Sequence, residues 1–242
     1  MSFFCYLTLE RCCVLAADNK KHVVTVKTTG EGRSTVHEVT TGDARKIFPL
    51  GTGWWMTGVG LAAFLQEVRQ HVQKALQGSE PGLDPAAAVL EKIAESPDEL
   101  RCLYRRRVEA LREGLPAESG RIEALEGLQD IVLVGFDAAS FPVILRSGSD
   151  ADFAFRRWCG PGITGFSGEN GAWDPAVVER IRLFLGDVVE DLQQCPPSQI
   201  GDRAWDLIPP LFQWLARAFP QRLSAHGDLV CLTPHEHQWL LF

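Results

Sequence analysis

The sequence predicts an α+β protein in which two stacked β-sheets lie between two layers of helices, a four-layer αββα sandwich. The first observation is the order of its segments: strands, a helix pair, strands, a second helix pair, and final strands. The second is that the helical segments are amphipathic, so each pair needs an apolar sheet face to cover. No repeat, low-complexity tract or linker divides residues 1–242, and we therefore expect a single domain.

The first eighteen residues predict a buried hairpin. Two apolar runs, 3–9 and 12–18, flank the polar pair Glu10-Arg11. If Met1 is removed, Ser2 becomes the first residue, and its hydroxyl then belongs to the same residue as a free α-amine. Such an amine has an ordinary pKa near ~8, so part of it is neutral at physiological pH and can act as a base.

The following segments continue the alternation. Short apolar runs separated by glycine-containing turns predict a second, more exposed hairpin over 23–39 and two strands at 46–50 and 54–58. A helix is expected over 61–76, because its apolar residues recur on one face. Asp84-Pro85 is typical of a helix start, and this second helix should run to about residue 112, with a break near 96–98.

The second half repeats this order. We expect strands at 131–136, 141–145 and 153–158, then a glycine-rich loop over 160–171 that lacks the Lys-Ser/Thr ending of a phosphate-binding loop. Helices are expected over 175–192 and 202–219, the latter kinked or restarted at Pro209-Pro210. A last hairpin should pair residues 229–232 with 238–241.

Composition restricts the class of protein. The chain is 45% hydrophobic and 23% charged, which is ordinary for a globular protein. Its net charge of −7, with no Lys/Arg run longer than three, gives no support for a nucleic-acid partner. No apolar stretch is long enough to span a bilayer and no secretory signal is apparent, so we expect no membrane contact and a cytoplasmic location.

The cysteines and histidines predict no metal site. The seven cysteines lack paired metal-ligand spacing, and five lie in apolar contexts that favour buried thiols in a reducing compartment. These five are Cys5, Cys12, Cys13, Cys159 and Cys231. His235 and His237 share a strand face, but no third ligand is identifiable, so a surface turn is the better interpretation. We expect no metal and no other cofactor.

Three segments resemble the proteasome β-subunit family and its bacterial relatives HslV and Anbu. They are Cys-Cys-Val-Leu-Ala-Ala-Asp at 12–18, Lys-Ile-Phe-Pro-Leu at 46–50 and Met-Thr-Gly-Val-Gly-Leu-Ala-Ala at 56–63, in the family's order. The resemblance implies the N-terminal-nucleophile (Ntn) hydrolase fold of the proteasome subunit and assembly into rings. In the family the nucleophile lies sixteen residues before the aspartate, and counting back from Asp18 gives Ser2.

The resemblance also implies roles for individual residues. Ser2 would be the nucleophile and its α-amine the base. Lys46 would lower the pKa of the nucleophile, and Asp18 would orient and ionise Lys46. Backbone N–H groups at Gly58 and Val59 would supply the oxyanion hole. Ser167, in a glycine-rich loop, would be the supporting serine.

The sequence also departs from the family. Serine stands where threonine is normal, the segment from 19 to 45 is longer, and the late Asp-x-x-Ser is Gln221-Arg222-Leu223-Ser224. Two functions therefore remain open. One is a proteasome-like N-terminal serine hydrolase that cleaves peptide or other amide bonds inside a homo-oligomer, either a ring or an open helix, to which an ATPase unfoldase could deliver unfolded protein. The other is a catalytically inactive scaffold subunit of such a ring. In both, the helix over 61–76 is expected to contact a neighbouring subunit, and the helix over 175–192 a stacked ring.

Overall fold

The computed structural model describes residues 3–28, 34–41, 44–51, 53–77, 97–114, 129–168 and 173–242. One five-stranded antiparallel sheet has the strand order β10-β1-β2-β11-β12. We call it the N-terminal sheet. Its strands are β1 (Phe3–Thr8), β2 (Cys13–Asp18), β10 (Thr164–Gly168), β11 (Gly227–Leu232) and β12 (His237–Leu241).

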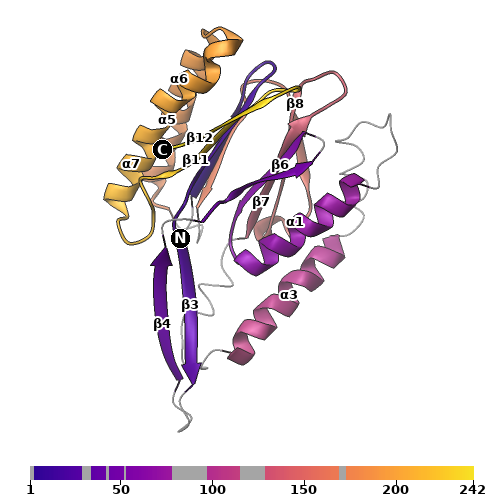
Figure 1. Ribbon diagram of the computed structural model, residues 1–242, viewed down its shortest axis with the longest axis vertical. Coiled ribbons are helices and arrows are strands. Elements are labelled where there is room, and N and C mark those ends of the chain that lie inside the picture. Colours follow the sequence, from indigo (N-terminus) through magenta and orange to yellow (C-terminus); the bar gives the residue numbers. More distant parts are fainter. Residues whose placement is uncertain are drawn as a thin grey trace.

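The second five-stranded antiparallel sheet has the order β5-β6-β7-β8-β9, and we call it the central sheet. A separate two-stranded sheet pairs β3 (Lys21–Thr28) with β4 (Ser34–Thr41) and extends away from the body of the molecule (Figure 1). The strands of the central sheet are β5 (Ile47–Gly51), β6 (Trp54–Val59), β7 (Asp130–Phe136), β8 (Pro142–Gly148) and β9 (Arg156–Cys159).

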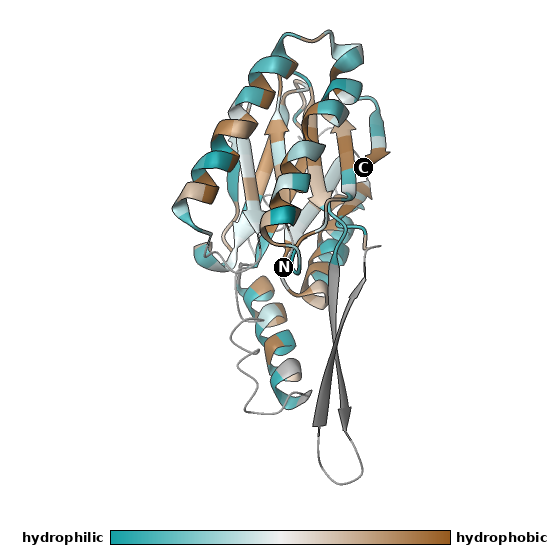
Figure 2. Cartoon of the chain, turned by 90° about the vertical axis from the view of Figure 1, so that its left-hand side faces the viewer, coloured by the Kyte–Doolittle hydropathy of each residue, from teal (hydrophilic) through white to brown (hydrophobic). Residues whose placement is uncertain are grey.

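Helices pack on each sheet. α1 (Ala62–Gln77) lies against the central sheet, and α3 (Pro97–Gly114) packs against α1 (Figure 1). The N-terminal sheet is covered by α5 (Pro175–Gln193), α6 (Ile200–Leu207) and α7 (Pro209–Ala218). Seen from their side, these helices alternate hydrophobic and hydrophilic residues (Figure 2), as expected of helices with one buried face. Short 3-10 turns occupy Ser149–Ala151 and Pro197–Gln199.

Three hydrophobic clusters hold these elements together. One joins the N-terminal sheet to α5, α6 and α7, and a second joins the central sheet to α1 and α3. The third lies between the two sheets and includes Tyr6, Leu15, Trp55 and Val132. Along β1 the side chains alternate between the helix side (Phe3, Cys5, Leu7) and the space between the sheets (Phe4, Tyr6). This alternation explains why β1 and β2 read as continuous apolar runs: both of their faces are buried.

The structure does not show the four-layer αββα Ntn-hydrolase fold that the sequence predicted, so that prediction is wrong. The structure supports the coarser class α+β, with two antiparallel five-stranded sheets. The β3–β4 sheet stands outside both of them (Figure 1). The prediction failed because the order of strands and helices indicates a class, whereas the number of layers depends on tertiary packing that periodicity does not specify.

Individual elements can be compared with their predictions. The strands and turns of the first hairpin, the hairpin over 23–39, the helix over 61–76 and the last hairpin are confirmed. The glycine-rich loop over 160–171 is wrong in part, because it contains β10, which pairs with β1 along the edge of the N-terminal sheet. The predicted helix start at Asp84-Pro85 lies outside the described residues, and α3 begins at Pro97.

Helix ends follow local chemistry. Asp174 caps α5, because its carboxylate accepts a hydrogen bond from Ala176 N at 2.8 Å and Pro175 occupies the first turn. Pro209 begins α7, and only Ile208 separates it from the end of α6, so the predicted restart of this helix is confirmed. No described helix has the length and apolar character needed to cross a membrane.

The cysteine prediction is right for four thiols and wrong for one. Cys5, Cys12, Cys13 and Cys231 are buried, but Cys159 is exposed because β9 is an edge strand whose four residues all face solvent. Burial raises the pKa of the Cys5 thiol to about 12 and holds that of Cys13 well above its ordinary value. The sulfur atoms of Cys12 and Cys231 lie 3.2 Å apart, and this contact, with burial, raises the pKa of Cys12.

These environments predict two classes of thiol. With Ellman's reagent at pH 8, Cys102 and Cys159 should react within minutes in the folded protein, because both are exposed. The four buried thiols should react only after unfolding, since both the reagent and the thiolate form are excluded there. Peptide mapping by mass spectrometry identifies the modified residues. Cys159→Ser should remove one fast equivalent, and fast labelling of Cys5 would contradict the assigned burial.

Candidate active site

Asp18 is buried at the end of β2. The hairpin register pairs Phe4 with Ala17, which leaves Phe3 facing Asp18. The backbone N–H of Phe3 donates a 2.8 Å hydrogen bond to Asp18 Oδ1, and the N–H of Lys20 donates to Oδ2 at 3.2 Å. The Asp18 side chain is 0% exposed, so these backbone donors partly replace the water that the carboxylate loses.

Lys46 brings the second sheet to this carboxylate. It directly precedes β5, and its Nζ lies 2.8 Å from Asp18 Oδ1, with 13% of the side chain exposed. Because β5 is an edge strand of the central sheet and β2 belongs to the N-terminal sheet, this ion pair links the two sheets. The sequence predicted this partnership, and the structure places the two residues in contact.

The backbone next to Ser2 is bonded to Asp18 through Phe3. Ser2 itself lies outside the described residues, so its geometry stays a prediction. The Phe3 N–H that bonds to Asp18 belongs to the peptide unit whose carbonyl is that of Ser2. Asp18 therefore holds both the chain next to Ser2 and the lysine ammonium. A hydroxyl near that ammonium would become more acidic, because a nearby positive charge favours the alkoxide.

Gly58 and Val59 end β6, the strand next to β5. Ile47 of β5 pairs with Thr57 of β6. Lys46 directly precedes Ile47, and Gly58 directly follows Thr57. A Cβ at Gly58 would lie 2.6 Å from the carbonyl oxygen of Asp130, so only glycine fits there. The next turn is fixed by Gln129, whose Oε1 accepts a 2.7 Å hydrogen bond from Leu61 N just before α1. These contacts give the segment the fixed backbone that an oxyanion-binding N–H requires.

Ser167 lies on β10 opposite Phe4 of β1. Its neighbour Phe166 packs with the helix-side cluster, so Ser167 faces the space between the sheets. The residue is 4% exposed, and its hydroxyl has no hydrogen-bond partner in the described part of the chain. A buried hydroxyl without a partner is costly, so Ser167 is available to a group that enters the space between the sheets.

The segment 220–226, which contains the altered Asp-x-x-Ser, also lies beside Asp18. Lys20 Nζ donates to the carbonyl of Pro220 at 2.8 Å, and Asn19 N donates to the carbonyl of His226 at 3.1 Å. The Ser224 hydroxyl accepts a 3.0 Å hydrogen bond from His226 N. The segment is thus near the site, but Gln221 replaces the expected carboxylate.

Sequence reasoning missed a polar cluster between the sheets. Arg146 donates to both carboxylate oxygens of Asp130, from Nε at 2.9 Å and Nη2 at 2.6 Å. Burial raises the pKa of the Tyr6 phenol, and the nearby Arg146 guanidinium opposes that rise. The sequence did contain a signal for this pair. Asp130 begins one apolar run and Arg146 ends the next, and the antiparallel pairing of these two strands brings both residues to the same end of the strand pair.

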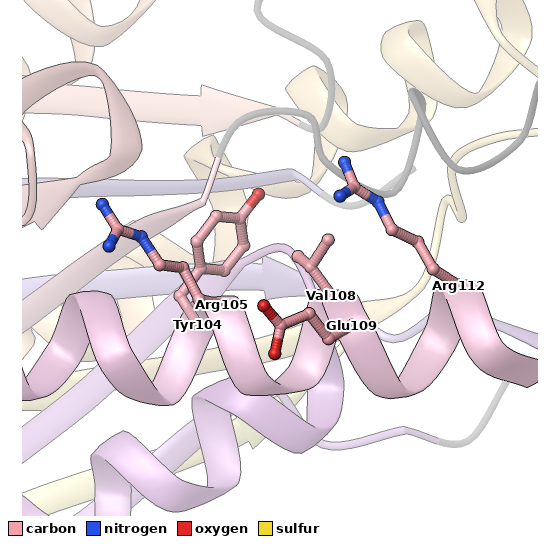
Figure 3. A pocket seen from close by; sticks show the side chains of 5 residues that line it. All are labelled: Tyr104, Arg105, Val108, Glu109 and Arg112. Carbon is pink, nitrogen blue, oxygen red and sulfur yellow. The ribbon is translucent and has the colours of Figure 1, made fainter.

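Other candidate sites carry less chemistry. A pocket on α3 is lined by Tyr104, Arg105, Val108, Glu109 and Arg112 (Figure 3), and none of the predicted site residues lies on that helix. His235 and His237 are exposed, and the described residues contain no group of three or more His, Cys, Asp or Glu side chains arranged to hold a metal ion. The site around Asp18 and Lys46 is therefore the candidate with the most specific geometry.

Comparison with known proteins assigns no family: no protein-family model matches this chain, and no curated protein matches it.

The Asp18–Lys46 pair predicts a specific pattern of destabilisation. Asp18→Asn or Lys46→Met alone should each lower the free energy of unfolding by about 3 kcal/mol, because each leaves a buried or nearly buried charge without its partner. The double variant should lose less than the sum of the two, with a coupling of at least about 1 kcal/mol. Urea unfolding followed by tryptophan fluorescence measures all four proteins.

The control uses the more exposed pair Asp191–Arg203, in which Arg203 donates two hydrogen bonds to the carboxylate, at 2.9 and 2.7 Å. Arg203→Met should lower the free energy of unfolding by less than either single change at Asp18 or Lys46, because solvent screens this pair. Strict additivity of the Asp18 and Lys46 changes would show that the pair does not couple the sheets.

Proposed function

We propose that this chain is an N-terminal serine hydrolase that cleaves amide bonds in peptides or unfolded protein. The observation that carries the proposal is the Asp18 carboxylate, which binds both the backbone next to Ser2 and the ammonium of Lys46. The motifs that resemble the proteasome β-subunit family support the proposal independently of this geometry.

The proposed reaction uses groups of this chain alone. After Met1 is removed, the free α-amine of Ser2 takes the proton from the Ser2 hydroxyl as its oxygen attacks the amide carbonyl. Lys46 stabilises the developing negative charge on Ser2, and Asp18 keeps Lys46 charged and oriented. The oxyanion accepts hydrogen bonds from backbone N–H groups at Gly58 and Val59.

The intermediate then collapses. The ammonium formed on Ser2 returns its proton to the leaving amine, and an ester between Ser2 and the acyl half of the substrate remains. Water, deprotonated by the same α-amine, attacks this ester and releases the carboxylic acid and the free hydroxyl. In this proposal the Ser167 hydroxyl supports the amine; its burial without a described partner, on a strand paired with β1, favours that role.

The proposal includes a homo-oligomer. We infer a cytoplasmic assembly of identical subunits, either closed rings or an open helix, with α1 and α5 as the contact surfaces. Head-to-tail contacts between identical subunits close into a ring when the rotation allows. Such a chamber would admit only small or unfolded substrates, and an ATPase unfoldase is a candidate partner.

The test of catalysis is labelling and turnover by the processed protein. Intact-mass measurement should show loss of Met1, and a β-lactone should acylate Ser2 by ring opening. Ser2→Ala should abolish labelling and lower kcat/KM for fluorogenic peptides at least about a thousandfold, because the nucleophile is absent. Ser198→Ala, at an exposed serine on another element, is the matched control and should leave both unchanged.

Two outcomes would overturn this proposal. Quantitative retention of Met1 in the native host would leave the base as an amide, without a free amine. A processed protein that assembles but neither binds the lactone nor cleaves peptides would instead support the inactive scaffold subunit.

The assembly is tested separately. Light scattering at micromolar concentration and moderate salt should give a mass many times the 26.8 kDa of one chain. Leu183 is 61% exposed on α5, so Leu183→Glu should weaken the proposed contact between rings and lower the mass. A monodisperse 26.8 kDa species in the unmodified protein would defeat the oligomer proposal.

A further inference from the structure

Two buried thiols meet on the helix side of the N-terminal sheet. Cys12 directly precedes β2, and Cys231 lies on β11, the strand that pairs with β2. Their sulfur atoms are 3.2 Å apart, although the two residues are 219 positions apart in the chain. Both side chains belong to the cluster that joins this sheet to α5, α6 and α7. The proposed hydrolysis uses neither of them.

The strand register explains why this particular pair meets. Cys231 pairs with Val14 of β2. Cys12, two residues before Val14, is therefore the diagonal neighbour of Cys231 on the same face, and diagonal neighbours lie within side-chain reach. Cys13 packs in the cluster between the sheets instead, on the opposite face of β2. The contact is thus specific to Cys12 and excludes the adjacent buried thiol.

The two pKa shifts indicate which thiol donates the hydrogen bond. The bond from Cys12 lowers the pKa of the Cys231 thiol, and the same bond together with burial raises the pKa of Cys12. The shared proton therefore stays on Cys12, and Cys231 has the greater thiolate character. Thiolates, not thiols, are the nucleophiles that peroxides oxidise. Cys231 is the thiol that reacts first, and Cys12 is already in contact as the second.

We propose that Cys12 and Cys231 are a redox site: a peroxide converts the two thiols into a disulfide that ties the turn between β1 and β2 to β11, and a small thiol reduces it again by exchange. The Cys231 thiolate attacks one peroxide oxygen and breaks the O–O bond, which gives a sulfenic acid. The Cys12 sulfur then displaces hydroxide from the Cys231 sulfur, and the Cys12 proton leaves with that hydroxide as water. With hydrogen peroxide, the two thiols together lose two electrons and two protons, and the peroxide becomes two water molecules.

Formation of the bond requires little movement. An S–S bond is about 2.05 Å long, so the two sulfurs must approach by about 1 Å from their 3.2 Å contact. Because β2 begins at Cys13, movement of Cys12 falls on the turn and leaves the pairing of the strand in place. Hydrogen peroxide is small and uncharged, so it can reach side chains that are only 4% and 7% exposed, where the larger, charged Ellman's reagent is excluded.

The bridge is expected to act on stability. It joins residues from the two ends of the chain, and a cross-link that closes a long loop restricts the unfolded chain strongly. Asp18 lies at the other end of β2 from Cys12, so the bridge leaves the Asp18–Lys46 pair in place. Oxidation should therefore make the folded protein more resistant to unfolding.

The test is treatment of the folded, fully reduced protein with hydrogen peroxide at neutral pH, followed by alkylation of the remaining thiols under denaturing conditions. Trypsin cleaves after Arg11, Lys20 and Arg222, so mass spectrometry should find peptides 12–20 and 223–242 as one linked species. Dithiothreitol should separate them. Peptide 12–20 also contains Cys13, and variants assign the bridge: Cys12→Ala should abolish it, whereas the matched control Cys13→Ala should retain it.

Thermal unfolding measures the consequence. Peroxide should raise the melting temperature of the unmodified protein by about 5 °C or more, and reduction should reverse the rise. The same treatment of Cys12→Ala should produce no rise, because no bridge can form.

Three results would overturn the inference: recovery of both thiols in alkylated form after peroxide, a Cys231 sulfinic acid as the main product, or a linked species that persists in Cys12→Ala. Ser2→Ala should form the bridge to the same extent as the unmodified protein. The redox site can therefore be confirmed or rejected independently of the proposed hydrolase.

Discussion

The carboxylate of Asp18 is the point on which the arrangement of this molecule depends. It is fully buried, and it accepts hydrogen bonds from the backbone of β1, from the chain beyond β2 and from the lysine that precedes β5. A buried charge is tolerated only when it is paired and hydrogen-bonded, so these three segments must meet there. The two sheets are thereby held in register at one end, where the proposed chemistry takes place.

Several buried polar groups on the two sheets and on α1 have no described partner. The hydroxyls of Thr57 and Ser167 and the Nε of Arg69 are buried without described partners, although most buried polar groups in proteins are hydrogen-bonded. In the pair Asp130–Arg146, by contrast, both carboxylate oxygens of the buried Asp130 accept a hydrogen bond from the partly exposed Arg146.

Particular residues show where prediction from the sequence reached its limit. The two-residue turn Glu10-Arg11 sets the register of the first hairpin, so the approach of Phe3 to Asp18 was already implied by the chain. Ser167 was read as part of a loop, because glycines mask the strand signal of β10, and Cys159 was read as buried, because an apolar context does not reveal an edge strand. The stacking of Arg69 on Phe48 was not foreseen, since no local pattern relates a helix to a strand 21 residues earlier.

By itself, the sequence determined the local elements, because hydrophobic periodicity and turn residues act over a few positions. The pairing of Asp18 with Lys46 came from the resemblance of its motifs to a known family. The tertiary structure alone decided how the elements stack, that β3 and β4 form a separate sheet, and that Arg69 of α1 stacks on Phe48 of β5. The reason is that layer packing and side-chain contacts between distant segments depend on the sum of many weak interactions. Such interactions join residues far apart in the sequence, so they produce no periodic pattern of hydrophobic residues from which they could be predicted.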